Sequence, residues 1–368
     1  MPLKVGIISA NWGAMAHLPA WRALDGVEVT AMCTSREESA RAATEKYGIE
    51  RPFWDFEAMC ADPDLDIIDC GTRPTLRHRM VQAAFEGGKH VYNGIPFAAN
   101  LSDARDMRAA WKASGKQGIV DALAQWVPAH RLMREMIDDG SLGTPFGGVC
   151  RFNMSFFNPP EKNFGYNWFS EGGHGVSAVR NMGSHALHLL VHLLGPIAEV
   201  VADDRLALKQ ADFPDGGGLT FENNDFVNAL LRFENGMILQ YQISWSGPLG
   251  EGWQLDLWGS KGHMIATDPS FPTPQGTKLR AGQSGGSLEE IAIPDRLKSA
   301  EGIGIDWTFP MPPSFPMALA MRSMVDSIEG RGAKPAPDFA QAYEVERVQE
   351  AIRISSNERC WVSLSDIP

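Results

Sequence analysis

The sequence predicts an α/β protein in which a doubly wound parallel sheet is followed by an α+β domain with an open, mainly antiparallel sheet. Three observations support this prediction. The chain has 368 residues, and at about 150 residues per domain this length suggests two domains. Strand and helix signals alternate up to residue 123, whereas segments typical of antiparallel strands follow it. We therefore expect one domain over residues 1–123 and a second over residues 124–368.

The first domain contains short apolar runs with strand character, separated by helical patterns. The expected strands are Leu3–Ser9, Val27–Cys33, Leu65–Gly71, His90–Tyr92 and Gly118–Ala122. The expected helices are His17–Leu24, Arg36–Tyr47, Arg77–Glu86 and Leu101–Ser114. Alternation of this kind forms βαβ crossovers and a parallel sheet that is covered on both faces. Such sheets bind ligands at the carboxyl ends of their strands, so we expect functional residues at that edge.

The second domain is predicted to be a sheet accompanied by a few helices. The expected strands are Gly148–Phe156, Ile197–Leu206, Phe226–Phe233, Met237–Ser246, Gln254–Trp258 and His263–Thr267. The expected helices are Ala129–Asp139, Val179–Leu194, Ser314–Glu329 and Phe339–Ser355. The sequence Glu234-Asn235-Gly236 between two of the strands is a hairpin signal. We expect the polar, aromatic segment 158–175 and the segment 269–287 to be loops.

Composition and charge exclude several classes of protein. The chain has 33 Lys and Arg against 45 Asp and Glu, a formal net charge of −12, which repels a nucleic-acid backbone. No run approaches the roughly 20 apolar residues of a membrane span, and the N-terminus lacks a signal-peptide layout. The five cysteines are widely spaced, as expected for reduced thiols in the cytoplasm. We therefore expect a cytoplasmic protein whose partner is a small molecule.

The turn after the first strand is where a dinucleotide-binding motif would lie. That motif needs three small residues so that the backbone can approach a pyrophosphate. Here its three positions are Ser9, Asn11 and Ala14, with Trp12 and Gly13 between them. These residues allow the turn to form, although the pattern departs from the usual glycines. Dinucleotide binding and a purely structural turn are both compatible with this segment.

The end of the second strand favours NADP over NAD. An acidic residue there would bind the ribose diol of NAD, but the sequence has Thr34, Ser35 and Arg36 instead. Hydroxyl and guanidinium donors match the oxygens of a 2′-phosphate. Ser35 can also act as a helix cap, with Glu38 completing a capping box, and the two roles are compatible.

The chain resembles the glucose–fructose oxidoreductase/inositol dehydrogenase/rhizopine-catabolism (Gfo/Idh/MocA) oxidoreductases over nearly its whole length. The resemblance rests on the order and spacing of many short segments. They are VGIISANWGAMAHLPAWRAL (5–24), TSREESARAATEKYG (34–48), DPDLDIIDCGTRPTLRHRMVQAAFEGGKHVY (62–92), MREMIDDGSLGTP (133–145), MGSHALHLLVHLLG (182–195), FENGMILQYQISWS (233–246) and WGSKGHM (258–264). The family implies a bound dinucleotide, a small-molecule substrate and a homodimer or homotetramer.

The chain departs from the family's motifs at the residues that carry proton transfer. The family's Glu-Lys-Pro segment reads Gly94-Ile95-Pro96 after Asn93, so Ile95 occupies the lysine position and cannot move a proton. The family's catalytic Asp corresponds to Asn181. The resemblance implies cofactor contacts near both altered segments and in the segment after the third strand: Gly71, Thr72, Arg73, His78, Asn93, Gly94 and Pro96.

His185 is the best candidate for an acid/base residue, with Asn181 orienting the substrate. An imidazole accepts or donates a proton near neutral pH. His188 and His192 follow at i+3 and i+7 on the same helix face, which could indicate a metal site. No carboxylate shares this spacing, however, and packing histidines are the alternative that we favour. We therefore predict no metal.

Other candidates lie in segments that face the substrate in the family. Tyr92 could replace the lost lysine as an acid if its pKa were lowered near nicotinamide. The proposed substrate-binding residues are Gln125, Trp126, Tyr166, Trp168, His174, Arg180 and His188. Each of them also has an ordinary structural interpretation. The chain contains 11 tryptophans, which suggests either core packing or an aromatic-lined cavity.

Three functions remain open from the sequence. The first is an NADP-dependent oxidoreductase, with NAD less favoured, that acts on a small sugar-, polyol- or aromatic-derived carbonyl or alcohol. The second is a lyase, epimerase or hydrolase that retains a bound nucleotide. The third is a non-catalytic sensor. In lacking the lysine, the chain resembles the branch of the family that contains the galactose-pathway transcriptional regulator. The retained histidine and the aromatic loop favour an enzyme.

Overall fold

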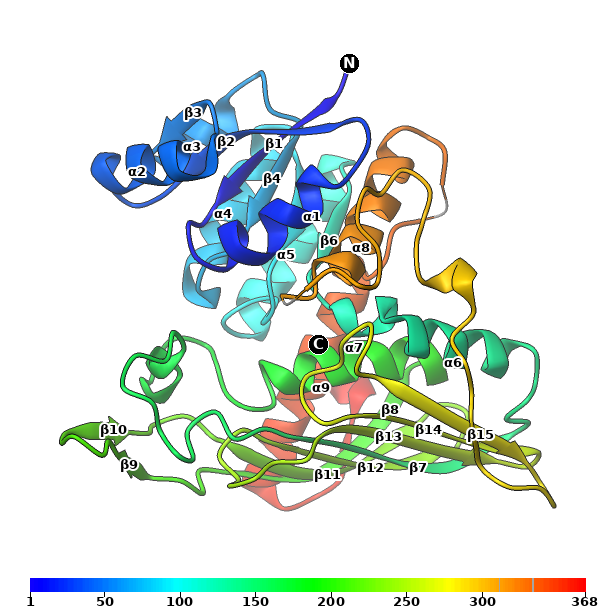
Figure 1. Ribbon diagram of the computed structural model, residues 1–368. Helices are drawn as coiled ribbons and strands as arrows, with labels where there is room; N and C mark the ends of the chain where they lie inside the picture. The colour runs from blue at the N-terminus through cyan, green and yellow to red at the C-terminus, as the bar shows by residue number, and fades with distance from the viewer. Residues whose placement is uncertain (311, 333) are drawn as a thin grey trace. The chain divides into compact units, whose positions relative to one another are not determined.

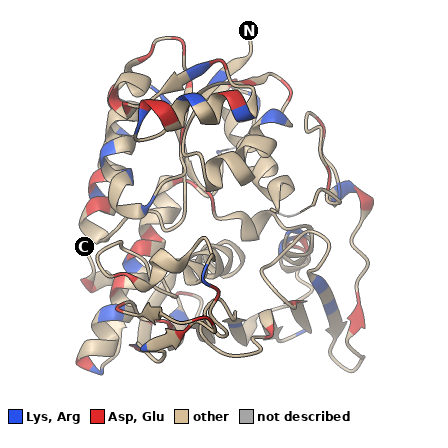
Figure 2. Ribbon diagram, turned by 60° about the vertical axis from the view of Figure 1, so that its left-hand side comes forward, with Lys and Arg blue, Asp and Glu red and all other residues tan. Residues whose placement is uncertain are grey.

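The computed structural model describes residues 1–310, 312–332 and 334–368 and divides into two compact units (Figure 1). Unit 1 comprises Met1–Trp126 and Lys298–Tyr343, and unit 2 comprises Val127–Leu297 and Glu344–Pro368. Among the described residues no helix is long and apolar enough to cross a membrane. Figure 2 shows acidic and basic residues interspersed along the helices.

Unit 1 is built on a six-stranded sheet in the order β3-β2-β1-β4-β5-β6. Every neighbouring pair is parallel. The strands are β1 (Leu3–Ile8), β2 (Val27–Cys33), β3 (Arg51–Phe53), β4 (Ile67–Cys70), β5 (His90–Asn93) and β6 (Gly118–Val120). The direction of winding reverses between β1 and β4, so the carboxyl ends of these two strands form the topological switch point of the sheet.

Unit 1 contains helices that connect its successive strands and others that come later in the chain than β6. They are η1 (Gly13–His17), α1 (Leu18–Arg22), α2 (Glu37–Tyr47), α3 (Phe56–Ala61), α4 (Pro74–Glu86), α5 (Leu101–Ser114), η2 (Leu123–Trp126) and α8 (Ser314–Ile328). The first five residues of α9 (Phe339–Glu358) also belong to this unit. Their Phe339 is fully buried, and its ring packs edge-on against Phe85 and Phe97.

Unit 2 is built on a nine-stranded sheet in the order β16-β15-β14-β13-β7-β12-β11-β8-β17. Strands β7 and β12 are parallel, and the other neighbours are antiparallel. The bounds are β7 (Pro145–Asn153), β8 (Ile197–Arg205), β11 (Phe226–Phe233), β12 (Ile238–Ser244), β13 (Gly252–Gly259), β14 (Gly262–Asp268), β15 (Lys278–Gln283), β16 (Glu289–Glu290) and β17 (Val362–Ser363). A small hairpin pairs β9 (Gln210–Asp212) with β10 (Gly218–Thr220).

Helices α6 (Pro128–Asp138) and α7 (Met182–Leu194) lie on one face of this sheet (Figure 1). Helix α9 bonds to the start of α7 through Gln349 and to the backbone of β8 through Ser355 and Ser356. Short helical turns occur at η3 (Asn167–Ser170), η4 (Asp295–Leu297) and η5 (Leu364–Asp366). The apolar side chains of α7 explain its position, because eleven of its thirteen residues are buried. A helix that is apolar on nearly all sides is stable only where protein surrounds it.

The predicted fold class is confirmed, with differences in detail. The strand β15 lies inside the segment 269–287, which was predicted to be a loop. Its sequence has no long apolar run, and it is a strand because it pairs with β14. The predicted domain of residues 124–368 also differs from the observed division. Residues 298–343 group with unit 1, where Phe339 is part of the core and the Ser314 hydroxyl donates to the Ala16 carbonyl.

Candidate functional site

The turn after β1 packs closely against the end of β4. A Cβ atom added at Gly71 would lie 3.3 Å from the Gly13 Cα and from the Ser9 Cβ. A Cβ at Gly13 would lie 2.9 Å from the Ile7 side chain. The Asn11 amide donates to the Ser9 hydroxyl over 3.2 Å, which tightens the turn. Glycines at these two positions therefore let the turn and the end of β4 pack closely at the switch point, where a pyrophosphate also needs close approach.

The residues after β2 were predicted to bind a 2′-phosphate. Ser35 and Arg36 are exposed. The Thr34 hydroxyl is already engaged, because it donates to the Arg36 carbonyl over 3.0 Å and contacts the Ser39 hydroxyl at 2.7 Å. The alternative role of Ser35 as a cap is not observed, since Arg36 is the N-cap of α2 and no side chain caps it. Ser35 and Arg36 are thus the accessible donors of this segment.

Arg77 holds the loop after β5, which contains Ile95, by hydrogen bonds to its backbone. The buried Arg77 guanidinium donates to the Pro96 carbonyl, and a Cβ at Gly94 would lie 2.7 Å from its Nη2 atom. Asn93 is fully buried and donates to the Phe97 carbonyl over 2.9 Å. The side chain of Asn93 and the carbonyl of Pro96 therefore hold the loop together, and a contact of either residue with a cofactor stays a prediction.

The remaining predicted cofactor residues of unit 1 lie between the end of β4 and the first half of α4. The Thr72 hydroxyl contacts the Met80 sulfur at 3.3 Å, and Arg73 is exposed at the N-cap of α4. His78 lies within α4, and its Nε2 is 3.5 Å from an Asp106 carboxylate oxygen on α5. This contact joins two helices, and a contact of His78 with the cofactor stays a prediction.

A buried charged cluster lies beneath the carboxyl edge of the sheet in unit 1. The fully buried imidazole of His17 has its Nδ1 2.9 Å from an oxygen of Asp69 and its Nε2 3.0 Å from an oxygen of Asp121. Trp21 donates its indole N–H to Asp69 over 2.8 Å, and Trp12 donates its own to Asp121 over 3.1 Å. Three separate segments of the chain meet in this cluster.

The two carboxylates hold a proton on His17. Burial alone would lower the pKa of this imidazole, but the negative charges of Asp69 and Asp121 overcome that effect and raise the pKa to about 10. Both ring nitrogens face carboxylate oxygens, so both must donate, and an imidazolium satisfies this requirement. The cluster therefore carries one proton and two carboxylates at neutral pH.

Tyr92 also belongs to this cluster, which corrects its predicted role. Its hydroxyl donates to Asp121 over 2.9 Å and its side chain is fully buried. Burial and the charge of Asp121 raise the pKa of Tyr92 well above its usual value. A replacement for the catalytic lysine would need a lowered pKa and access to the substrate, and Tyr92 has neither.

In unit 2, His185 lies in the first turn of α7. Its side chain is 9% exposed, and its ring meets that of Phe271 edge-to-face with centroids 5.0 Å apart. Asn181 is the N-cap residue of this helix, but its side chain makes no capping hydrogen bond. The neighbouring Ser184 hydroxyl donates to the Arg180 carbonyl and accepts from Gln349, which fixes the first turn. The helix start thus holds His185 next to an aromatic ring.

Phe271 is presented by a loop that one buried carboxylate organises. Asp268 accepts from the backbone amides of Ser270 and Thr273, each over 3.0 Å, and from the hydroxyls of Thr273 and Thr277. A Cβ at Gly276 would lie 2.5 Å from the same carboxylate, so this glycine is needed for the loop to close. Sequence analysis missed Phe271 because the loop carries no motif.

Two of the other predicted substrate residues on or near α7 are engaged within the protein. The Arg180 guanidinium lies 2.7 Å from the buried Glu346 carboxylate and donates to the Gly175 carbonyl over 3.0 Å. This pairing neutralises the charge that was predicted to attract an anionic substrate. His188 is fully buried, and desolvation lowers its pKa to about 3. It is a neutral packing histidine, so its predicted substrate contact is wrong.

The aromatic loop of unit 2 is a packed cluster. Tyr166 packs against Phe169, and Phe169 stacks on Trp245 with centroids 5.1 Å apart. Trp168 meets His174 edge-to-face, and the His174 Nε2 is 2.9 Å from a Glu171 oxygen. These contacts bring the three predicted residues Tyr166, Trp168 and His174 into one loop. Their contact with a substrate stays a prediction.

Gln125 and Trp126 belong to unit 1, where both make hydrogen bonds. The Gln125 carbonyl oxygen accepts from Gln341 over 3.2 Å, and the Trp126 indole donates to the Ala336 carbonyl over 3.0 Å. Gln125 is buried and Trp126 is half-buried. These bonds fix the short helix η2 at the end of the parallel sheet.

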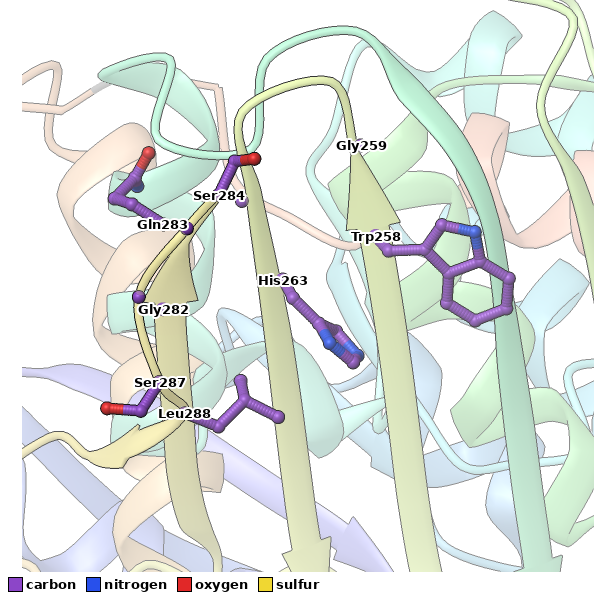
Figure 3. Close-up of a pocket in the computed structure, with 11 residues that line it drawn as sticks. Trp258, Gly259, His263, Gly282, Gln283, Ser284, Ser287 and Leu288 are labelled. Atoms are coloured by element: carbon purple, nitrogen blue, oxygen red, sulfur yellow. The ribbon is translucent and has the colours of Figure 1, made fainter.

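The described residues contain no group of three or more His, Cys, Asp or Glu side chains arranged to hold a metal ion. Two surface hollows in unit 2 are lined by none of the predicted site residues. One, of about 310 Å³, lies over β13, β14 and β15 beside Trp258 and His263 (Figure 3). The other, of about 540 Å³, lies beside the loop that contains Leu249.

His17, Asp69 and Asp121 are functional candidates that sequence analysis missed. Each was hidden inside an element that reads as ordinary core. The available signal was a charged residue in an apolar strand, as in the sequence around Asp69, because an ionised group is rarely buried without a partner. That signal does not identify the partner, which comes from 52 or 104 residues away in the chain.

Comparison with known proteins places both units in one family. The description "Oxidoreductase family, NAD-binding Rossmann fold" matches residues 3–122, and "GFO/IDH/MocA C-terminal domain" matches residues 130–265. A D-apiose dehydrogenase of Paraburkholderia graminis is 31% identical over 54% of this chain, and the match spans 52% of that relative. A 1,5-anhydro-D-fructose reductase of Ensifer adhaerens is 27% identical over 90% of each chain.

Solved structures show the same fold. The structure of a levoglucosan dehydrogenase in complex with NADH and L-sorbose is 20% identical and covers all of both chains with a TM-score of 0.87. The two domain descriptions match in the expected order and together span most of the sequence. The chain belongs to the GFO/IDH/MocA family of NAD-binding oxidoreductases.

Proposed function

We propose that this protein is an NAD(P)-dependent oxidoreductase that interconverts a carbonyl and an alcohol on a small sugar- or polyol-like substrate. The alternative is an aromatic-derived substrate. The family membership supports the redox class. The names of the relatives support the substrate class, since apiose, anhydrofructose and levoglucosan are all sugars or sugar derivatives. The absence of a catalytic lysine sets this chain apart from the family's usual motif.

The close approach of Gly13 and Gly71 is the observation that carries the proposal. Side chains at these positions would meet the neighbouring backbone or side chains, so the turn and the end of β4 can pack this closely only without them, at the switch point where a dinucleotide binds in such sheets. The residues fit a dinucleotide: Ser9–Ala14 and Gly71 would hold the pyrophosphate, and Ser35 and Arg36 the adenosine ribose or its phosphate. The bound nicotinamide supplies the hydride chemistry.

His185 supplies the proton in this proposal. Reduction of a carbonyl requires a donor for the developing alkoxide, and oxidation of an alcohol requires an acceptor for its proton. Ile95 in the lysine position provides neither, and Asn181 provides hydrogen bonds without titrating. His185 at the start of α7 is held by Phe271 on one side, which fixes its ring for directed proton transfer.

A binding titration followed by a turnover assay tests the proposed function. NADPH and NADH are titrated into the purified protein and followed by nicotinamide fluorescence, and a panel of sugar and aromatic carbonyls is then monitored at the nicotinamide absorbance. We expect micromolar binding and turnover of at least one sugar-derived compound. Failure of both dinucleotides to bind below millimolar concentration would contradict the proposal.

A dinucleotide-binding sensor is the second candidate, and one observation favours it. Neither the family's lysine nor its aspartate is present, since Ile95 and Asn181 stand in their places. Binding of NADPH without turnover of any compound in the panel would favour the sensor. Conversion of a substrate without net change in nicotinamide absorbance would favour a lyase, epimerase or hydrolase that retains the nucleotide.

The preference for NADP is tested at Arg36. We expect Arg36→Ala to weaken NADPH binding by roughly 10- to 150-fold, because a guanidinium–phosphate contact contributes about 1.5–3 kcal/mol. NADH has no 2′-phosphate, so its affinity should stay within twofold. The measurement is the dissociation constant of each cofactor.

Arg41→Ala is the matched control for this test. Arg41 lies on the same helix, but it pairs with Glu37 at 2.8 Å and is well exposed. This variant should bind both cofactors like the wild type. Equal weakening of NADH and NADPH in Arg36→Ala would overturn the assignment of a 2′-phosphate contact.

A further inference from the structure

The buried cluster of His17, Asp69 and Asp121 has a fixed excess of negative charge. Both carboxylates and the imidazole are at most 3% exposed. The His17 nitrogens lie 2.9 and 3.0 Å from the two carboxylates. One additional proton is therefore shared among the imidazole and the two carboxylates. Whether that proton sits on the imidazole or on an oxygen, the three groups together carry one net negative charge.

The cluster lies on the half of the sheet that takes the second nucleotide. A doubly wound sheet binds the two halves of a dinucleotide on either side of its switch point. The switch point lies between β1 and β4, and the adenosine half is expected beside β2, where Ser35 and Arg36 are. Asp69 lies on β4 and Asp121 directly follows β6, so the cluster lies below the opposite, nicotinamide half.

The cluster is also connected to the turn that the dinucleotide would contact. Trp12 lies in that turn, between Asn11 and Gly13, and its indole N–H donates to Asp121 over 3.1 Å. The Asp121 amide in turn donates to the Asn93 carbonyl over 2.8 Å, at the end of β5. Asp121 therefore reaches the carboxyl edge of the sheet rather than its centre.

We propose that the His17–Asp69–Asp121 cluster makes the nicotinamide site selective for the oxidised cofactor, because its net negative charge favours the positively charged nicotinamide ring over the neutral reduced ring. A bound cofactor whose oxidised form is favoured is a stronger hydride donor, so the cluster biases the enzyme toward carbonyl reduction. Hydride leaves the reduced ring with its electron pair, and the substrate carbonyl receives it. This inference rests on the dinucleotide binding proposed above.

The test compares the dissociation constants of the oxidised and reduced cofactors in charge-changing variants. Asp121→Asn removes one negative charge while its amide can still accept from Trp12 or His17. We expect the ratio of the oxidised to the reduced dissociation constant to rise about fivefold. This is the effect of one unit charge on the nicotinamide ring if the two are roughly 10 Å apart, the width of two strand spacings, and the effective dielectric constant lies between those of protein and water.

Asp69→Asn is the matched variant, because it makes the same charge change without touching Trp12. Its amide oxygen can still accept from His17 and from Trp21. We expect the same rise in the ratio. Trp12→Phe keeps the charge and removes the indole hydrogen bond, so it should change both dissociation constants together and leave their ratio within twofold of the wild type.

Isothermal titration gives the affinity of the oxidised cofactor, and nicotinamide fluorescence gives that of the reduced one. A rise of the ratio in both Asn variants supports the inference. An unchanged ratio in both overturns it, as does a rise in Asp121→Asn alone, which would assign the effect to Trp12. If circular dichroism shows that one Asn variant does not fold, the other decides. A wild type that binds neither cofactor refutes the proposed function itself, and the inference with it.

Discussion

Replacing His185 with glutamine should lower kcat by about 10²- to 10⁴-fold, the range that general acid–base catalysis contributes. Glutamine keeps a hydrogen-bonding side chain of similar reach but cannot exchange a proton near neutral pH. The substrate still binds through its other contacts, so KM should change by less than kcat. The measurement is steady-state turnover of the substrate that the carbonyl panel identifies, over pH 5 to 9.

The pH profile separates a catalytic role of His185 from a structural one. The wild type should show a titration in kcat that His185→Gln lacks, whereas a merely destabilised protein would keep the profile at lower amplitude. His192→Gln is the matched control, because His192 lies on the same helix two turns further on and is partly exposed. Unchanged turnover in His185→Gln would eliminate this residue as the acid/base.

The free energy of unfolding should fall by about 1.4 kcal/mol per pH unit between pH 6.5 and pH 9 because of His17. The pKa of His17 is raised from 6.5 to about 10 in the folded protein by Asp69 and Asp121, against the lowering effect of burial. The folded state therefore keeps a proton that the unfolded chain releases above pH 6.5. The stabilisation is complete below pH 6.5, and it is lost as the pH rises toward 10.

Urea unfolding at four pH values across this window measures the effect. The total loss by pH 9 should be roughly 3 kcal/mol, large relative to the stability of an ordinary domain. Above pH 9 the buried thiols add their own dependence, since burial raises the pKa of Cys33 and Cys60 to about 12. His17→Gln should show a flat profile over the same window. A wild-type stability that is independent of pH there would contradict an ionised His17.

The strand–helix alternation of the first half could be predicted from local patterns because each element carries its own signal. The apolar runs that form β1 and β2 end in small or polar residues, and the helices between strands repeat apolar residues at helical spacing. The strand β3 was missed, because Arg51–Phe53 is three residues long and contains a proline. Its strand state comes from pairing with β2.

The position of residues 298–343 could not be predicted from chain order. The helix α8 follows the strands of unit 2 in the sequence, yet it packs with α1 and η2 of unit 1. Burial decides this, because Phe315 and the neighbouring methionines of α8 are almost completely buried. Local periodicity predicts that a helix has an apolar face, but it does not identify the surface that covers that face.

The sequence by itself determined the fold class, and it predicted the place of a dinucleotide turn and a lysine position occupied by Ile95. These features are local, since each depends on residues close together in the chain. Only the tertiary structure decided which titratable groups interact. It removed Tyr92 and His188 from the active groups by burial, paired Arg180 with Glu346, and joined His17 to Asp69 and Asp121. The physical reason is that charge and pKa depend on neighbours in space, and those neighbours are distant in the sequence.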